Sequence, residues 1–242
     1  MNRPRITPSI VPNMFTAMNM FCGFVSIVNA SSGEYIYAAW LIIIAAIFDT
    51  LDGWMARLTK SSSALGVQLD SLSDLVSFGV APAYLIYRIY LIDFNATGII
   101  ISSLLMIAGG FRLARFNVQL VGFDKTFFTG LPIPSSAITV ATFIIAFYEK
   151  QRGFNPSALV FIIPMVLILS FLMVSRVRYD TLPHFNKKEF KEKPYFYFAP
   201  IVIAVVIIFF PLKWVLFILF VLMILFGIFR YIYNLLSSKK LT

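Results

Sequence analysis

Four aspartates, two on each side of a short polar segment, are the residues whose type and spacing point most directly to chemistry. They are Asp49, Asp52, Asp70 and Asp74. Since a helix turns about 100° per residue, Asp49 and Asp52 share one helix face, and Asp70 and Asp74 share one face of the next helix. An antiparallel pair of helices can therefore bring all four carboxylates to one point.

Such a cluster needs positive charge beside it. Four ionised carboxylates repel one another, so either protons or metal ions must neutralise them. A set of oxygen ligands without His or Cys favours Mg²⁺, Mn²⁺ or Ca²⁺ over Zn²⁺. Two bound ions are common in phosphoryl transfer because they hold both the attacking and the leaving oxygen. We therefore predict a site for Mg²⁺ or Mn²⁺, with two ions, on the four aspartates.

Residues beside the aspartates suit a substrate that carries phosphate. Gly53 and Gly66 lack side chains on the same two faces, which lets a ligand approach the backbone closely. Arg57 follows one turn after Gly53, and its forked donors match a phosphate group. Small residues in a membrane helix also serve close helix packing, so this indication rests on the whole pattern rather than on any one glycine.

The elements that position these residues are membrane helices. The chain has 242 residues, of which 60% are hydrophobic and 13% charged, against about 45–50% and about 25% in soluble domains. This composition excludes an ordinary cytosolic enzyme, a disordered chain and a nucleic-acid-binding domain, so we expect no nucleic acid partner. It predicts an all-α integral membrane protein, a bundle of about eight transmembrane helices. We place them at 9–30, 35–58, 66–92, 97–117, 132–149, 156–175, 195–210 and 212–232.

The distribution of charge orients this bundle. With eight spans, most of the 20 Lys and Arg residues fall on the side that holds both termini and the aspartate cluster. The positive-inside rule then places that side in the cytoplasm and the protein in the cell (inner) membrane. On that same side, we expect Lys187, Lys188, Lys191 and Lys193 to face anionic membrane lipids.

Residues 49–57 and 66–74 together match the pattern D-x-x-D-G-x-x-A-R-x8-G-x-x-x-D-x-x-x-D in full. This pattern resembles the signature of the CDP-alcohol phosphatidyltransferase family, which transfers a phosphatidyl group from a CDP-linked lipid to an alcohol and releases CMP. The resemblance implies a core of six membrane helices, to which this chain would add two at its C-terminus. It also implies a homodimer. We divide the single membrane domain into a catalytic core at 1–150, with five spans, and C-terminal helices at 151–242.

The resemblance also assigns roles to residues. It implies that Asp49, Asp52 and Asp70 are metal ligands, and that Asp74 is both a metal ligand and the general base of catalysis. A serine hydroxyl must lose its proton as it attacks phosphorus, and a nearby carboxylate can take that proton. The family positions that bind CDP correspond to Asp49, Gly53, Ala56, Arg57 and Gly66.

Four further strings resemble the phosphatidylserine synthase branch of the family, at residues 13–23, 77–82, 112–117 and 128–134. They imply CDP-diacylglycerol as donor and L-serine as acceptor. The carboxylate of serine needs a cation, so we assign the acceptor pocket to Arg112, Arg115, Asn117 and Asn19. The two arginines could instead anchor the helix at the membrane surface, and Asn19 could instead hydrogen bond another helix.

Other functions stay open at this point. Within the family, the acceptor could be glycerol 3-phosphate, an inositol phosphate or another amino alcohol, although a phosphorylated acceptor would need more cations beside the aspartates. The donor could carry archaeal lipid tails. Outside enzymes, a proton or cation transporter could use the same acidic residues, but it would not depend on Arg57.

Overall fold

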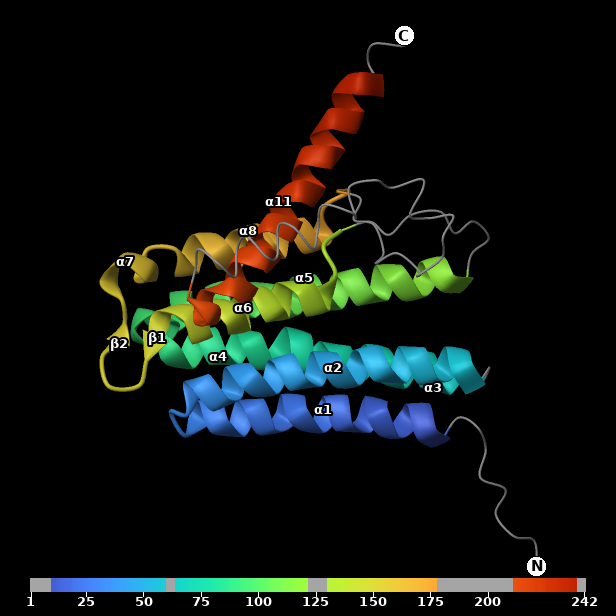
Figure 1. The fold of residues 1–242 in the computed structure, drawn as a ribbon, viewed down its shortest axis with the longest axis horizontal. Helices are drawn as coiled ribbons and strands as arrows, with labels where there is room; N and C mark the ends of the chain where they lie inside the picture. Colours follow the sequence, from blue (N-terminus) through green and yellow to red (C-terminus); the bar gives the residue numbers. More distant parts are fainter. Residues whose placement is uncertain (1–9, 60–63, 122–129, 178–210, 239–242) are drawn as a thin grey trace, which may run out of the picture.

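The computed structural model describes residues 10–59, 64–121, 130–177 and 211–238. Its first half is a bundle of long apolar helices that run back and forth along one axis (Figure 1). The elements in order are α1 (Ile10–Ser31), α2 (Tyr35–Thr59), α3 (Ala64–Asp74), a π-helical turn (Leu75–Val80), α4 (Ala81–Ile89), a 3₁₀ turn (Leu91–Phe94) and α5 (Asn95–Val121).

The second half continues the bundle and contains a short β hairpin. Its elements are α6 (Ile133–Phe147), β1 (Tyr148–Glu149), β2 (Gly153–Phe154), α7 (Pro156–Leu159), α8 (Ile162–Val174) and α11 (Leu212–Ser238). The two strands pair antiparallel, with Tyr148 opposite Phe154. The second strand begins at Gly153, whose φ of +71° is a left-handed conformation that glycine adopts at little cost.

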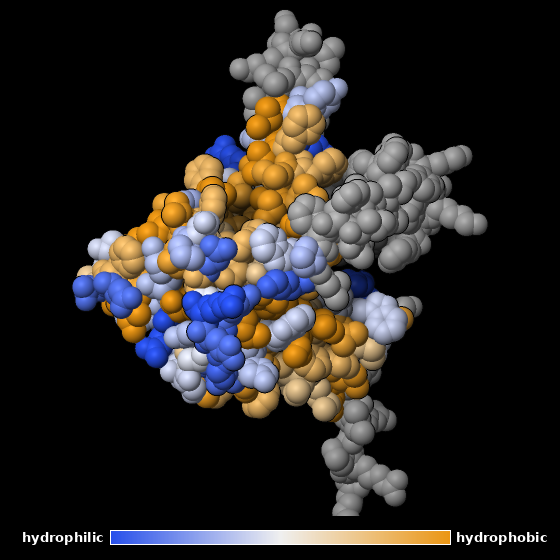
Figure 2. All heavy atoms as spheres, turned by 60° about the vertical axis from the view of Figure 1, so that its left-hand side comes forward, coloured by the Kyte–Doolittle hydropathy of each residue, from blue (hydrophilic) through white to orange (hydrophobic). Residues whose placement is uncertain are grey.

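Small side chains let the helices approach closely. Ala30 on α1 and Ala38, Ala39 and Ala45 on α2 are fully buried, as expected where small residues replace the hydrophobic effect in bringing membrane helices together. Helix α6 lies at the centre and contacts α2, α4, α5, α8 and α11. Large apolar side chains remain on the outside of the bundle (Figure 2), where lipid would cover them.

The all-helical membrane class is confirmed, but the prediction of eight spans is wrong. Among the described residues, six helices are long and apolar enough to cross a membrane. They are Ile10–Ser31, Tyr35–Thr59, Leu65–Ile89, Leu91–Val118, Pro156–Val174 and Lys213–Tyr233. The span predicted at 132–149 is α6, whose 15 residues reach about 22 Å at 1.5 Å per residue. That is short of a hydrocarbon core of about 30 Å. The span predicted at 195–210 lies outside the described residues.

The two ends of the bundle differ in chemistry. The start of α1, the end of α2, the start of α3 and the end of α5 lie together at the right of Figure 1; we call this the aspartate end. The α1–α2 turn and the β1–β2 hairpin lie at the other end, the hairpin end, where hydrophilic side chains gather (Figure 2). There Lys150 Nζ lies 2.6 Å from Glu34 Oε1, and this hydrogen bond raises the pKa of Lys150. The pair ties the hairpin to the α1–α2 turn.

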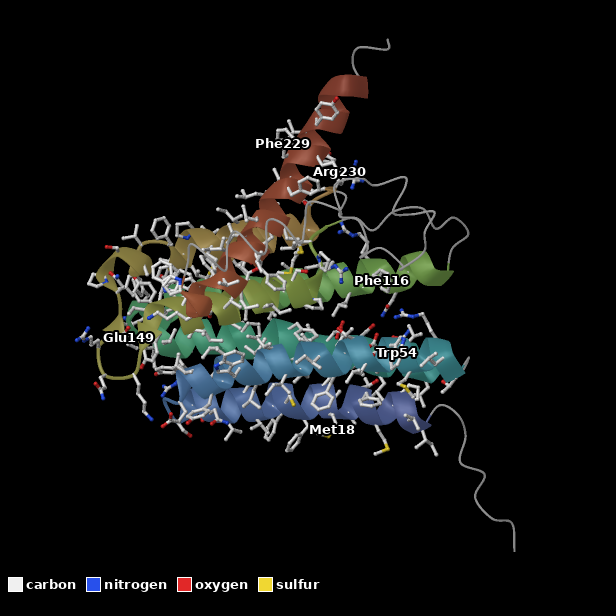
Figure 3. All side chains as sticks on the ribbon, in the orientation of Figure 1. Met18, Trp54, Phe116, Glu149, Phe229 and Arg230 are labelled. Carbon is white, nitrogen blue, oxygen red and sulfur yellow. The ribbon has the colours of Figure 1, made fainter. Side chains whose placement is uncertain are left out.

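Helix α11 crosses the bundle obliquely (Figure 1). Its first turns pack on α6, where the Trp214 ring lies 4.8 Å from the Phe147 ring and Phe217 lies 5.5 Å from Phe143. Its later turns, which carry Phe229, extend away from the other described helices (Figure 3). Neither part of α11 approaches the aspartates, so the site depends on the helices that precede it.

Candidate active site

Three of the four aspartates meet at one point. Asp49 comes from α2, and Asp70 and Asp74 from the last two turns of α3. One carboxylate oxygen from each of the three lies within 4.8 Å of those of the other two. The predicted helical hairpin therefore gathers its acidic side chains, and we call these three residues the aspartate triad.

Asp52 lies beside the triad rather than within it. Its carboxylate is buried and close enough to interact electrostatically with Asp70 and Asp49. Its Oδ2 atom accepts a hydrogen bond of 2.9 Å from the Thr16 hydroxyl on α1. Asp52, the fourth predicted ligand, is therefore at the site. It belongs to α2, but its carboxylate is held by a hydroxyl group on α1.

Two observations test whether the triad suits a divalent cation. A carboxylate oxygen of Asp49 and one of Asp74 lie within 4.8 Å of each other and of an Asp70 oxygen, and like charges this close repel unless a proton or a cation neutralises them. Asp70 Oδ1 is buried and has no hydrogen-bond partner among the described residues. A buried polar atom without a partner is costly, and coordination to a metal would satisfy it. The residues present therefore fit a hard divalent ion.

A π-helical turn follows Asp74 directly. Such turns are rare and frequently occur at functional sites. Here the turn carries Ser77 to α1, where its hydroxyl donates to the Asn19 carbonyl at 2.8 Å. A Cβ atom added to Gly23 would lie only 2.7 Å from the Ser77 Cα atom, so glycine is needed for this approach. Contact between α1 and the π turn consequently fixes where Asp74 sits.

The residues predicted to bind CDP lie at the aspartate end. A Cβ atom added to Gly53 would meet only Arg57 Nη1, at 4.0 Å, among the described residues. The face of α2 at Gly53 is therefore open, and the Arg57 side chain is exposed beside it. Ala56 and Gly66 are half-buried at the same end. A ligand could therefore approach the α2 backbone at Gly53 without meeting a described side chain other than Arg57.

Arg112 is the predicted acceptor residue that faces the acidic cluster. Its guanidinium interacts electrostatically with Asp74 and Asp49 and lies 6.0 Å from the centre of the Phe116 ring. Its Nε atom is buried and has no hydrogen-bond partner within the part of the chain that the structure describes. Figure 3 shows Phe116 on α5 and Trp54 on α2 at this same end. Arg112 thus offers a free donor next to the triad.

The other predicted acceptor residues are engaged in contacts of their own. Arg115 donates to the carbonyls of Val174 at 3.0 Å and Met173 at 3.2 Å, where α8 ends. Asn117 Nδ2 donates to the Ser71 hydroxyl at 3.0 Å and so joins α5 to α3. Asn19 Nδ2 donates to Asp74 Oδ1 at 3.4 Å. The structure brings Asn19 to the triad, whereas Arg115 caps a helix.

Sequence reasoning missed the hydroxyl groups that support the aspartates. Thr16 bonds Asp52, and the Ser73 hydroxyl donates to the Thr16 carbonyl at 3.0 Å. The available signal was the spacing of Thr16 and Asn19, two polar residues three positions apart in an otherwise apolar helix. Polar side chains at such a spacing in membrane helices commonly make hydrogen bonds between helices.

Comparison with known proteins agrees with this site. The family model for CDP-alcohol phosphatidyltransferases matches residues 9–174, a range that includes every side chain of the site and most of the chain. The chain belongs to the CDP-alcohol phosphatidyltransferase family.

Several curated relatives share more specific names. The chain is 37% identical over 184 residues to the CDP-diacylglycerol–serine O-phosphatidyltransferase of Helicobacter pylori (strain ATCC 700392 / 26695), covering 76% of each chain. It is 34% identical over 178 residues to the enzyme of that name from Bacillus subtilis (strain 168), covering 73% of this chain and 92% of the relative. It is also 39% identical over 180 residues to the archaetidylserine synthase of Methanothermobacter thermautotrophicus, covering 73% and 75%.

Proposed function

We propose that this protein is a CDP-diacylglycerol–serine O-phosphatidyltransferase, a phosphatidylserine synthase. The observation that carries the proposal is the meeting of three buried or half-buried carboxylates from α2 and α3, with ligand atoms within 4.8 Å, in a chain of this family. The relatives named for serine transfer in bacteria support the choice of acceptor.

The triad and Asp52 would hold the metal. We assign Asp49, Asp70 and Asp74 to one divalent ion and Asp52 to a second ion beside it, with Mg²⁺ or Mn²⁺ as the expected species. When bound, such ions neutralise charge on the diphosphate of the donor and on the departing CMP. The orphaned Asp70 Oδ1 atom supports this assignment.

Asp74 is the group we assign to proton transfer. In the proposed reaction the serine hydroxyl oxygen attacks the phosphorus that bears diacylglycerol, and the bond from that phosphorus to the CMP oxygen breaks. The hydroxyl proton passes to a carboxylate oxygen of Asp74. Asn19 donates to Asp74 Oδ1 at 3.4 Å, which helps to hold the carboxylate in place.

The two substrates would enter from different sides of the triad. We assign the cytidine diphosphate to the open face of α2 and α3, at Gly53, Ala56, Arg57 and Gly66, with Asp49. We assign the serine carboxylate to Arg112, whose buried Nε has no partner among the described residues. Arg115, Asn117 and Asn19 would complete the walls of this acceptor pocket.

We further propose that the aspartate end faces the cytoplasm and that the enzyme works as a homodimer. The described cations at that end, among them Arg57, Arg112 and Arg115, have the sign that the positive-inside rule expects of a cytoplasmic face. Serine is water-soluble and CDP-diacylglycerol is a lipid, so a site close to one membrane surface lets the two meet.

A second candidate differs only in the donor. The relative named archaetidylserine synthase, at 39% identity, favours a donor with archaeal lipid tails as the alternative. Serine as acceptor is common to both candidates.

Transfer assays on the purified protein test the proposal. The protein in detergent, with Mn²⁺, CDP-diacylglycerol and labelled L-serine, should place label in the lipid fraction and release CMP in equal amount. Asp74→Asn should abolish transfer, whereas Asp93→Asn, which changes an exposed acid at the hairpin end, should not. Transfer to glycerol 3-phosphate in place of serine would overturn the acceptor, and reaction with only the archaeal donor would select the second candidate.

A further inference from the structure

Helix α1 contributes no aspartate, yet it makes side-chain contacts with two of them. Thr16 is 4% exposed and Asn19 is 0% exposed, so both lie inside the bundle. The Thr16 hydroxyl donates to Asp52 and the Asn19 amide donates to Asp74. These two residues are three positions apart and therefore share one face of α1.

The position of the Thr16 hydroxyl is tightly determined. Threonine is branched at Cβ, so its χ1 angle has few choices in a helix, and one of them lets Oγ1 bond the carbonyl four residues earlier. Thr16 adopts that arrangement, because Oγ1 lies 3.2 Å from the Pro12 carbonyl as well as 2.9 Å from Asp52 Oδ2. The Ser73 hydroxyl in turn holds the Thr16 carbonyl at 3.0 Å, which fixes the backbone of α1 against α3.

The single proton of the Thr16 hydroxyl must choose between these two acceptors. A hydrogen bond to an ionised carboxylate is roughly twice as strong as one to a neutral carbonyl. The proton therefore points to Asp52 whenever that carboxylate is charged. One oxygen of Asp52 is then held toward α1, and the carboxylate cannot rotate freely beside the triad.

We infer that Thr16 is a positioning residue. Its hydroxyl holds Asp52 in the orientation needed to bind the metal ion that would contact CDP-diacylglycerol. The inference rests on the proposed function, because it gives the purpose for which Asp52 is held. It explains why Asp52, the one of the four clustered aspartates that lies outside the triad, is buried against α1 without a described cationic side chain as its hydrogen-bond partner. Hydrogen bonds to a metal-binding carboxylate typically change metal affinity or activity by about 10- to 100-fold when removed.

Thr16→Val tests the inference, since valine keeps the shape of threonine and removes its donor. The matched control is Thr139→Val on α6. Thr139 is also buried, at 2% exposure, and its hydroxyl also donates to the carbonyl four residues earlier, at 2.7 Å, but it contacts no aspartate. Mn²⁺ binding to the detergent-purified protein, followed by the loss of the free-ion paramagnetic resonance signal, gives a readout that does not require turnover.

We expect Thr16→Val to weaken Mn²⁺ binding by about 10-fold, Thr16→Ser to stay within about 3-fold of the original protein, and Thr139→Val to leave affinity unchanged. Equal affinity in Thr16→Val and the original protein would overturn the inference, and so would an equal loss in Thr139→Val. Thermal unfolding without Mn²⁺ checks that each variant is folded, and Thr16→Ala replaces the valine variant if that one is not.

A double-mutant cycle with Asp52→Asn shows whether Thr16 acts through Asp52. If it does, Thr16→Val changes Mn²⁺ affinity by less than about 2-fold in the Asp52→Asn background, because the two changes are then not additive. The same loss in both backgrounds would refute the inference. Failure of the proposed function looks different, since the unmodified protein would then transfer no serine, or Asp70→Asn would bind Mn²⁺ as well as the original.

Discussion

Replacing Arg112 should separate serine binding from metal binding. In Arg112→Gln the side chain keeps a donor but loses its charge and its forked geometry. A charged hydrogen bond to a carboxylate contributes about 1.5–3 kcal/mol. At about 1.4 kcal/mol for each factor of ten, the expected fall in kcat/KM for serine is about 10- to 150-fold.

The position of Arg112 also predicts the direction in which its replacement changes Mn²⁺ affinity. Its guanidinium interacts with Asp74 and Asp49, which are two members of the triad, so its positive charge opposes a cation at that point. Removing the charge should therefore tighten Mn²⁺ binding while it weakens serine binding. A variant that merely damaged the fold would lose both.

The assay measures the initial rate of labelled serine transfer with Mn²⁺ saturating, first over a range of serine concentrations at saturating CDP-diacylglycerol and then over a range of CDP-diacylglycerol concentrations at saturating serine. A rise in KM for serine with KM for CDP-diacylglycerol unchanged is the expected result. The control is Arg88→Gln at the hairpin end, where Arg88 Nη2 donates to the Ser31 carbonyl at 3.1 Å. If KM for CDP-diacylglycerol rises and KM for serine does not, Arg112 contacts the donor and our assignment is wrong.

Three further predictions concern the metal, a helix cap and a close contact. Asp70→Asn should abolish both transfer and the rise in melting temperature that Mn²⁺ produces, and a retained rise would show that the ion binds elsewhere. Arg115→Gln should lower the melting temperature, because Arg115 caps the carbonyls at the end of α8, with KM for serine changed less than in Arg112→Gln; the opposite ranking would show that Arg115, and not Arg112, is the main contact of the serine carboxylate. Gly23→Ala should reduce activity and stability together, since its Cβ atom would collide with Ser77, and normal melting with normal activity would contradict the close approach of α1 to the π turn.

The part of the site that the sequence predicts is the part set by helical periodicity. Asp49 and Asp74 lie on two helices joined by a short segment, so the spacing alone brings them together. The separate place of Asp52 was not predictable in this way, because it depends on a hydroxyl from α1. The capping role of Arg115 was also hidden, since its partners come from the end of α8, far along the chain.

The wrong number of predicted membrane spans shows a different limit of prediction from sequence. The ends of α6 were predicted to within two residues, at 132–149 against Ile133–Phe147, but the helix is three residues shorter in total and falls below the roughly 17 residues that a span needs. A run of apolar residues indicates that a helix is shielded from water. It does not show whether lipid or neighbouring helices shield it. Helix α6 is buried on most of its surface by the helices around it, so its apolar character does not require it to face lipid.

The aspartates and the residues that we assign to the nucleotide all lie within residues 49–74, but the side chains that place the carboxylates come from outside this short pattern. Thr16 and Asn19 approach them from α1, and Arg112 approaches from α5, which Arg115 fastens to the end of α8. A chain that kept the pattern and lost these partners would keep the carboxylates without the orientation that the proposed metal site requires.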